Sequence, residues 1–277
     1  MEIIPFTLTR FLYIKDEVLL SLLISVLEKD YDQSLFWASE LYYSGYEKET
    51  LEYIDAIYVT FFRSQNPKLN RIVKYGLEKY NKGIHMAASI LLNLTSKPRK
   101  YTLQDFAAKN DDPEIIEKSY ETETNILIFS EPKYAEKYKF SELSHIQNRK
   151  ILNHVCKYST YKQWGKIFNI PIVSMNQKEL WKKHNHNWLF YASYCPLWAK
   201  RIEEYCGTVD EENEKVVFKD DDWFEKFHEK FEYEIDEQSI DIQNKILHTS
   251  SIKQLTLQDL LNKYESHRKT HIIRKRK

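Results

Sequence analysis

The sequence predicts an all-α protein: an N-terminal antiparallel helical bundle or short α-solenoid, followed by a second helical region. The chain has 277 residues, 42% hydrophobic and 30% charged, which suits a folded protein with a sizeable core. Apolar residues recur at helical spacing along the first hundred residues. Gly45, Gly83 and Gly207 each follow a segment with apolar residues at helical spacing. The residue after a helix is often left-handed, a conformation that glycine adopts easily, so we predict that these glycines cap helix C-termini.

The first predicted helix covers residues 16–29, "DEVLLSLLISVLEK", and is apolar nearly all round. Such a helix is buried on both sides, so we expect it at the centre of the bundle. Four further helices are predicted at residues 33–44, 47–62, 69–80 and 84–94. The connections between them are short, so consecutive helices should be antiparallel neighbours.

The stretch from Ser34 to Phe62 is rich in aromatic residues, which could form either a core or an aromatic ligand site. Its rings recur at the spacing of a helix face that packs against other helices. Aromatic side chains dominate cores and interfaces alike. We interpret the stretch as core, with Trp37 buried.

The predicted organisation is a helical bundle at residues 1–95, an irregular connector at 96–140, a second helical region at 141–262 and a basic tail at 263–277. The connector is rich in prolines and in charges of both signs. It contains the only segment that we predict as a strand, residues 125–129, "NILIF".

Within the second region we expect a helix from Ser141 to about Tyr158 and another before Asn187. A further helix should be broken or started by Pro196. The acidic run that begins at Asp220 predicts an amphipathic helix with its aspartates at the positive end of the dipole. Three rings should share one face of this helix: Phe224, Phe227 and Phe231.

No motif for a cofactor or for catalysis stands out in this sequence. The five glycines form neither a G-x-G-x-x-G nor a G-x-x-x-x-G-K-[ST] pattern, so we expect no nucleotide cofactor. We predict no catalytic residue and favour a non-enzymatic function. Asp220, Asp221 and Asp222 could hold a divalent cation, but capping of a helix start explains them.

A zinc site or a cysteine nucleophile would have to come from scattered histidines and cysteines. The candidates are His145, His154, Cys156, His184, His186, Cys195 and Cys206. They include no C-x-x-C and no H-E-x-x-H spacing, so we expect no metal. A metal- or cysteine-dependent hydrolase built on this set is the least favoured of our functional hypotheses.

Three cysteines in a chain of this length, and a start without the features of a signal peptide, predict a reducing, intracellular location. No apolar run approaches the ~18 residues that cross a bilayer. We therefore expect no membrane segment.

The net charge is zero, but the charges are unevenly placed. Residues 209–237 contain thirteen acidic and four basic residues, a net charge of −9, whereas residues 263–277 contain seven basic and one acidic residue, a net charge of +6. The tail could be a solvated end, a nuclear-import signal, a contact for nucleic acid or a segment that docks onto an acidic surface. Its candidate polyanion-binding residues are Arg268, Lys269, Arg274, Lys275, Arg276 and Lys277.

Two N-terminal stretches, "FTLTRFLYIKDEVLLSLL" from Phe6 to Leu23 and "LFWASELYYSGYE" from Leu35 to Glu47, occur in a chain rich in Lys, Ile, Asn and Tyr. In these stretches the chain resembles an uncharacterised group of helical proteins from large nucleocytoplasmic DNA viruses. The resemblance covers mainly the first hundred residues. It implies a cytoplasmic, viral setting and no particular mechanism.

Two functional hypotheses follow from the sequence. The first is a non-enzymatic helical scaffold that binds another protein. The second is a nucleic-acid-associated accessory factor that uses the basic tail for weak, non-specific contacts. They differ in whether other basic residues lie beside the tail in three dimensions.

Overall fold

The computed structural model describes residues 7–63, 67, 69–78, 83–95, 130–139 and 177–231. These residues are mostly helical, with one small two-stranded sheet, which confirms the predicted fold class. The predicted helix at 141–158, the predicted strand at 125–129 and the basic tail lie outside the described residues. No helix in the described part combines the length and apolar character needed to span a bilayer.

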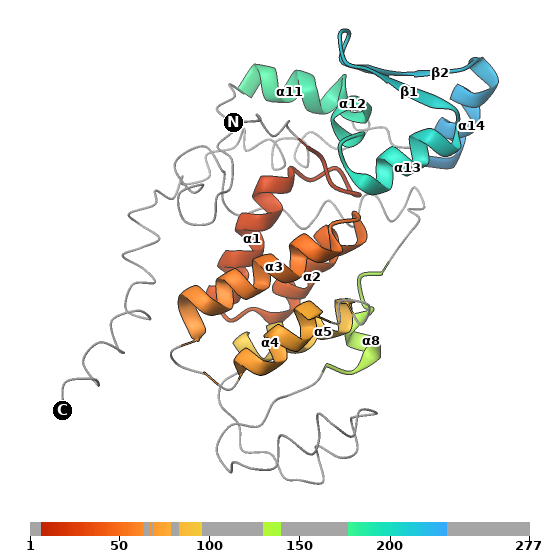
Figure 1. Cartoon of the computed structure of the whole chain (residues 1–277). Coiled ribbons are helices and arrows are strands. Elements are labelled where there is room, and N and C mark those ends of the chain that lie inside the picture. Colours follow the sequence, from red (N-terminus) through yellow and green to blue (C-terminus); the bar gives the residue numbers. More distant parts are fainter. Residues whose placement is uncertain are drawn as a thin grey trace, which may run out of the picture. The chain divides into compact units, whose positions relative to one another are not determined.

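The described residues form two compact units (Figure 1). The first, which we call the hairpin unit, contains residues 7–21, 43–46 and 177–231. The second, the bundle unit, contains residues 22–42 and 130–139 together with the described residues between 47 and 95. Each unit therefore combines segments that are far apart in the sequence.

The first five helices lie close to their predicted positions. They are α1 (Lys15–Leu27), α2 (Tyr31–Tyr43), α3 (Glu47–Ile57), α4 (Leu69–Glu78) and α5 (Gly83–Thr95). The chain continues from α3 into a π-helical turn, η1 (Tyr58–Phe62). Within the bundle unit α3 packs against both α4 and α5 (Figure 1).

Burial follows the predicted pattern in these helices. Val18, Leu20, Leu22 and Val26 on α1 are each fully buried, which agrees with a helix that is apolar all round. Trp37 is 2% exposed and lies edge-on to Phe36, with 4.8 Å between the ring centroids. The aromatic stretch is therefore core, as predicted.

The described part of the second region starts with α11 (Gln177–Asn185), α12 (Trp188–Ala192) and α13 (Pro196–Glu204). Pro196 does start a helix, because its fixed φ suits the first helical position and its missing N–H leaves no donor unpaired there. A hairpin of β1 (Gly207–Asp210) and β2 (Lys215–Phe218) follows, and α14 (Asp221–Phe231) covers it.

Two of the three predicted glycine caps are wrong. Gly45 has φ +93° and follows α2 as expected, and a Cβ there would lie 2.6 Å from Cβ of Pro196. Gly83 instead opens α5, where a Cβ would collide with the Tyr42 hydroxyl. After α13 the left-handed residue is Cys206, with φ +56°, and Gly207 begins β1.

The N-terminal arm, residues 7–14, is an integral part of the hairpin unit. Leu8 pairs with Ile14 in an isolated bridge, and the Leu8 amide donates to the Tyr191 carbonyl at 3.3 Å. The Trp198 indole donates to the Thr9 carbonyl at 3.2 Å. Leu8, Leu12, Phe190, Trp198 and Phe227 belong to one buried cluster, so the arm completes the core of residues 177–231.

Candidate interaction surface on the hairpin and helix α14

The hairpin consists of two four-residue strands joined by an acidic turn. β1 and β2 are antiparallel, with Thr208 opposite Val217 and Val209 opposite Val216. The Asp210 carboxylate accepts hydrogen bonds from the Asn213 amide at 3.1 Å and from its side chain at 2.9 Å. Hydrogen bonding from Asn213 also lowers the pKa of Asp210, so the turn is held by an ionised carboxylate.

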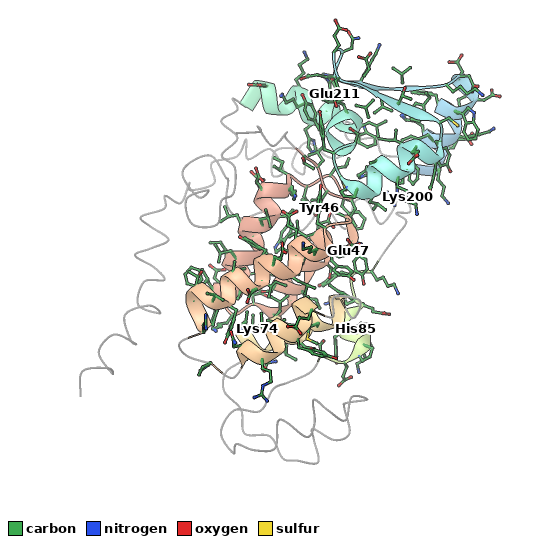
Figure 2. All side chains as sticks on the ribbon, in the orientation of Figure 1. Tyr46, Glu47, Lys74, His85, Lys200 and Glu211 are labelled. Carbon is green, nitrogen blue, oxygen red and sulfur yellow. The ribbon has the colours of Figure 1, made fainter. Side chains whose placement is uncertain are left out.

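A tyrosine that follows α12 ties this turn to the rest of the hairpin unit. The Tyr194 hydroxyl donates to Oε2 of Glu211 at 2.7 Å, and the Tyr191 hydroxyl is buried beside it in the hairpin unit. Figure 2 labels Glu211 on the turn. Burial, and then the hydrogen bond to Glu211, raises the pKa of Tyr194 to about 12. Burial likewise raises the pKa of Tyr191.

These raised pKa values define what the cluster can do chemically. A phenol with a raised pKa stays protonated at neutral pH and acts as a hydrogen-bond donor, not as a base or nucleophile. Tyr194 therefore positions the turn through Glu211. The arrangement has the character of a structural clamp.

An aromatic cluster supports the other end of the hairpin. The Phe218 ring lies 4.9 Å from the Phe227 ring, and Phe227 is fully buried. The guanidinium of Arg201 lies 4.6 Å from the ring centroids of both Trp198 and Phe231. The rings and this cation fix α14 against α13 and β2.

The start of α14 is capped by its own aspartates. The Asp220 carboxylate accepts a hydrogen bond from the Trp223 amide at 3.1 Å, and Asp221 and Asp222 occupy the first turn. These are the roles predicted from the sequence: a cap and two charges that favour the positive end of the helix dipole.

Large apolar side chains remain exposed on this small module. Phe224 is 49% exposed, Val217 is 43% exposed and Val209 is 41% exposed. Val209 shares a face of the hairpin with Val216 and Phe218, because side chains alternate along each strand. The Phe224 ring lies 5.8 Å from the Phe218 ring, so Phe224 extends this face onto α14.

The segment that carries these apolar side chains is acidic. Residues 207–231 contain nine acidic and four basic side chains, a net charge of −5. Seven of the acidic residues are exposed: Glu211, Glu212, Asp220, Asp221, Asp222, Glu225 and Glu229. We call the exposed side chains of residues 207–231 the acidic surface; Val209 and Phe224 are its apolar residues on one side of the hairpin, and Val217 lies on the other side.

The histidines and cysteines considered as metal ligands form no metal-binding group within the described residues. His184 is buried and Nε2 hydrogen-bonds to the Leu12 carbonyl at 3.1 Å. The buried Cys195 thiol donates to the Ser44 carbonyl at 3.1 Å, while Cys206 is exposed. Among the described residues no three His, Cys, Asp or Glu side chains form a group that could hold a metal ion.

His145, His154 and Cys156 lie outside the described residues. The same is true of the six candidate polyanion-binding residues of the tail, Arg268, Lys269, Arg274, Lys275, Arg276 and Lys277.

Neither the hairpin nor its contact with Tyr194 is predicted from the sequence. The signal that could have found the hairpin is the pair of short β-branched runs, Thr208–Val209 and Val216–Val217, on either side of the polar residues 210–215. Nothing local marks Tyr194 as a partner of this turn, because it precedes the turn by many residues.

Comparison with known proteins adds no relative: no protein family, curated protein or solved structure matches this chain.

Proposed function

We propose that the protein is a non-enzymatic helical scaffold that binds another protein through the acidic surface. The observation that carries this proposal is Phe224, a large ring that is 49% exposed on a helix whose neighbouring exposed side chains are mostly acidic. Exposed apolar side chains with a polar rim are typical of protein-binding sites.

The charge of the surface indicates the chemistry of the partner. A net charge of −5 over residues 207–231 favours a partner segment that carries lysines or arginines. The exposed side chains of Val209 and Phe224 would take one or two apolar side chains of the same segment. A basic, amphipathic protein segment meets both requirements.

The chemistry of the site agrees with binding more than with catalysis. Tyr191 and Tyr194 are protonated donors, and the aspartates at the start of α14 are used in capping. A general base requires a group whose pKa lies near the working pH and which can reach a substrate proton. The clamp and the caps do not supply such a group.

The test is affinity capture with tagged full-length protein from nuclease-treated extract of its native source. Wild type is compared with Phe224→Ser and with the control Val59→Ser, which changes a residue that is 44% exposed in the bundle unit. We expect a protein that wild type and Val59→Ser both retain and that Phe224→Ser loses at least tenfold. Equal capture by all three variants would reject the acidic surface as the binding site.

The alternative function is that of a nucleic-acid-associated accessory factor, favoured by the net charge of +6 over residues 263–277. We also propose a cytoplasmic, viral setting for the protein, which the resemblance of the first hundred residues implies. Nuclease treatment separates the two functions, since it would release a complex that depends on nucleic acid.

A further inference from the structure

Residues 130–139, "SEPKYAEKYK", lie against α2 and α5 of the bundle unit, although 34 residues separate Ser130 from the end of α5 at Thr95. The segment includes the four-residue helix α8 (Pro132–Ala135), which packs beside α5 in Figure 1. A helix this short has little stability of its own. Its conformation therefore depends on the surface beneath it.

The first residue of the segment is held through its backbone and its hydroxyl. The Ser130 amide donates to Oγ of Ser89 on α5 at 3.0 Å. The Ser130 hydroxyl lies 2.9 Å from the hydroxyl of Tyr31 on α2. Two helices thus hold the start of the segment.

The other end is held by one carboxylate that contacts two consecutive side chains. Oδ1 of Asp32 accepts a hydrogen bond from the Lys137 ammonium at 2.5 Å, and Oδ2 accepts one from the Tyr138 hydroxyl at 2.9 Å. The Tyr138 ring lies edge-on to Phe36 at 5.2 Å. Asp32 and Phe36 together therefore contact a lysine and the tyrosine that follows it.

Between these ends the contact is narrow. Ala135 is fully buried, and Glu136 lies 3.4 Å from Nε2 of His85, which Figure 2 labels on α5. Of the ten residues only Ala135 and Tyr138 are buried. The neighbouring helices α3 and α5 also contact each other, and both carry fully buried aliphatic side chains such as Ile54 and Leu91.

The contact thus has the features of peptide recognition: a short segment, few buried anchors and hydrogen bonds to specific side chains. Segments of this kind open at a lower free energy than the core beneath them. While it is attached, the segment occupies the site at a high effective concentration because it belongs to the same chain.

We propose that Tyr31, Asp32, Phe36, His85 and Ser89 form a peptide-recognition site, which the chain fills with its own residues 130–139. The partner it accepts is a protein segment with the same pattern. That pattern is a serine, any four residues, a small residue, any one residue, and then a lysine followed by a tyrosine. Such a partner must displace the chain's own segment. The site is on the bundle unit and is separate from the acidic surface.

The test uses full-length protein and a fluorescent peptide with the sequence of residues 130–139. In the double variant Lys137→Ala/Tyr138→Ala the chain's own segment loses its hold on Asp32 while the site stays intact. We expect this variant to bind the peptide at least tenfold more tightly than wild type does. Adding Asp32→Asn should remove that gain, and adding Glu52→Gln, an exposed carboxylate on α3, should leave it unchanged.

A second variant guards against misfolding of the double variant. Tyr138→Phe keeps the buried ring and removes only the hydroxyl that donates to Asp32, so its melting temperature should stay near that of wild type. It should bind the peptide more tightly than wild type does, by a smaller factor. Failure of both folded variants to bind the peptide, or binding that Asp32→Asn does not weaken, would overturn the proposal and leave residues 130–139 as ordinary packing.

Discussion

Trp37 illustrates that the aromatic residues of the first region form a packed core. It is 2% exposed and packs edge-on against Phe36 in the bundle unit. Truncation leaves a cavity that the surrounding helices cannot fill completely, so we expect Trp37→Ala to lower the free energy of unfolding by about 3–5 kcal/mol in urea titration. The control Trp223→Ala removes a half-buried ring and should cost about 1 kcal/mol. Equal losses in the two variants would contradict the assignment of Trp37 to the core.

His184 contributes to stability only while it is neutral. Burial lowers its pKa, because the charged ring would lose its hydration beneath the N-terminal arm. The unfolded chain therefore binds a proton more readily than the folded protein does. The contribution of neutral His184 to the free energy of unfolding is complete above about pH 6.5. It is lost as the pH falls below that value, and the free energy of unfolding then drops by at most about 1.4 kcal/mol per pH unit.

The measurement is the free energy of unfolding between pH 5 and pH 8. We expect His184→Gln to flatten the pH dependence, while the control His186→Gln, which changes an exposed histidine nearby, keeps the wild-type slope. A slope that survives in His184→Gln would show that another group is responsible.

Among the elements, the hairpin depends most on contacts from elsewhere in the chain. A two-stranded sheet is marginal by itself, and this one is held by Tyr194 and the rings of α14. Removing the hydroxyl in Tyr194→Phe should cost about 0.5–1 kcal/mol locally. We expect roughly threefold to fivefold faster amide exchange in residues 207–218, with little change in global stability. Tyr134→Phe, an exposed tyrosine of the bundle unit, should leave this exchange unaltered.

The helices and the hairpin also differ in how far the sequence predicts them. Each of the first five helices begins within about two residues of its predicted start, because repeated apolar spacing over three turns is a strong local signal. The hairpin was missed because each strand has only four residues and the turn between them is acidic. Gly207, read as a helix cap, is instead the first residue of β1, with Cys206 in the left-handed conformation.

The candidate sites are less predictable than the elements that carry them. The acidic charge of residues 209–237 is visible in the sequence, but the exposure of Phe224 is not. Phe224, Phe227 and Phe231 recur at helical spacing, and the sequence does not show that Phe224 alone is exposed while the other two rings are packed. The contacts of Asp32 with Lys137 and Tyr138 join residues more than a hundred positions apart. Only tertiary structure brings such residues together.

At the scale of the whole molecule, the neutral total charge conceals an acidic region at 209–237 and a basic tail at 263–277. If the tail contacts a polyanion, binding releases counterions, and affinity falls steeply with salt. We expect weak binding to duplexes regardless of their sequence, abolished by removing residues 268–277, because charge on a chain end supplies attraction without base readout. Titration of two duplexes at two salt concentrations measures this. Full binding by the truncated chain would move the nucleic-acid site away from the tail.

The central claim, that the acidic surface binds another protein, is tested most directly by photo-crosslinking in the native source. A photoreactive amino acid replaces Phe224 in one variant and Val59 in the other; these residues are 49% and 44% exposed. Our account predicts a crosslink from position 224 to a protein that carries a basic segment, with no such product from position 59. A crosslink from position 224 to nucleic acid, or the same products from both positions, would contradict it.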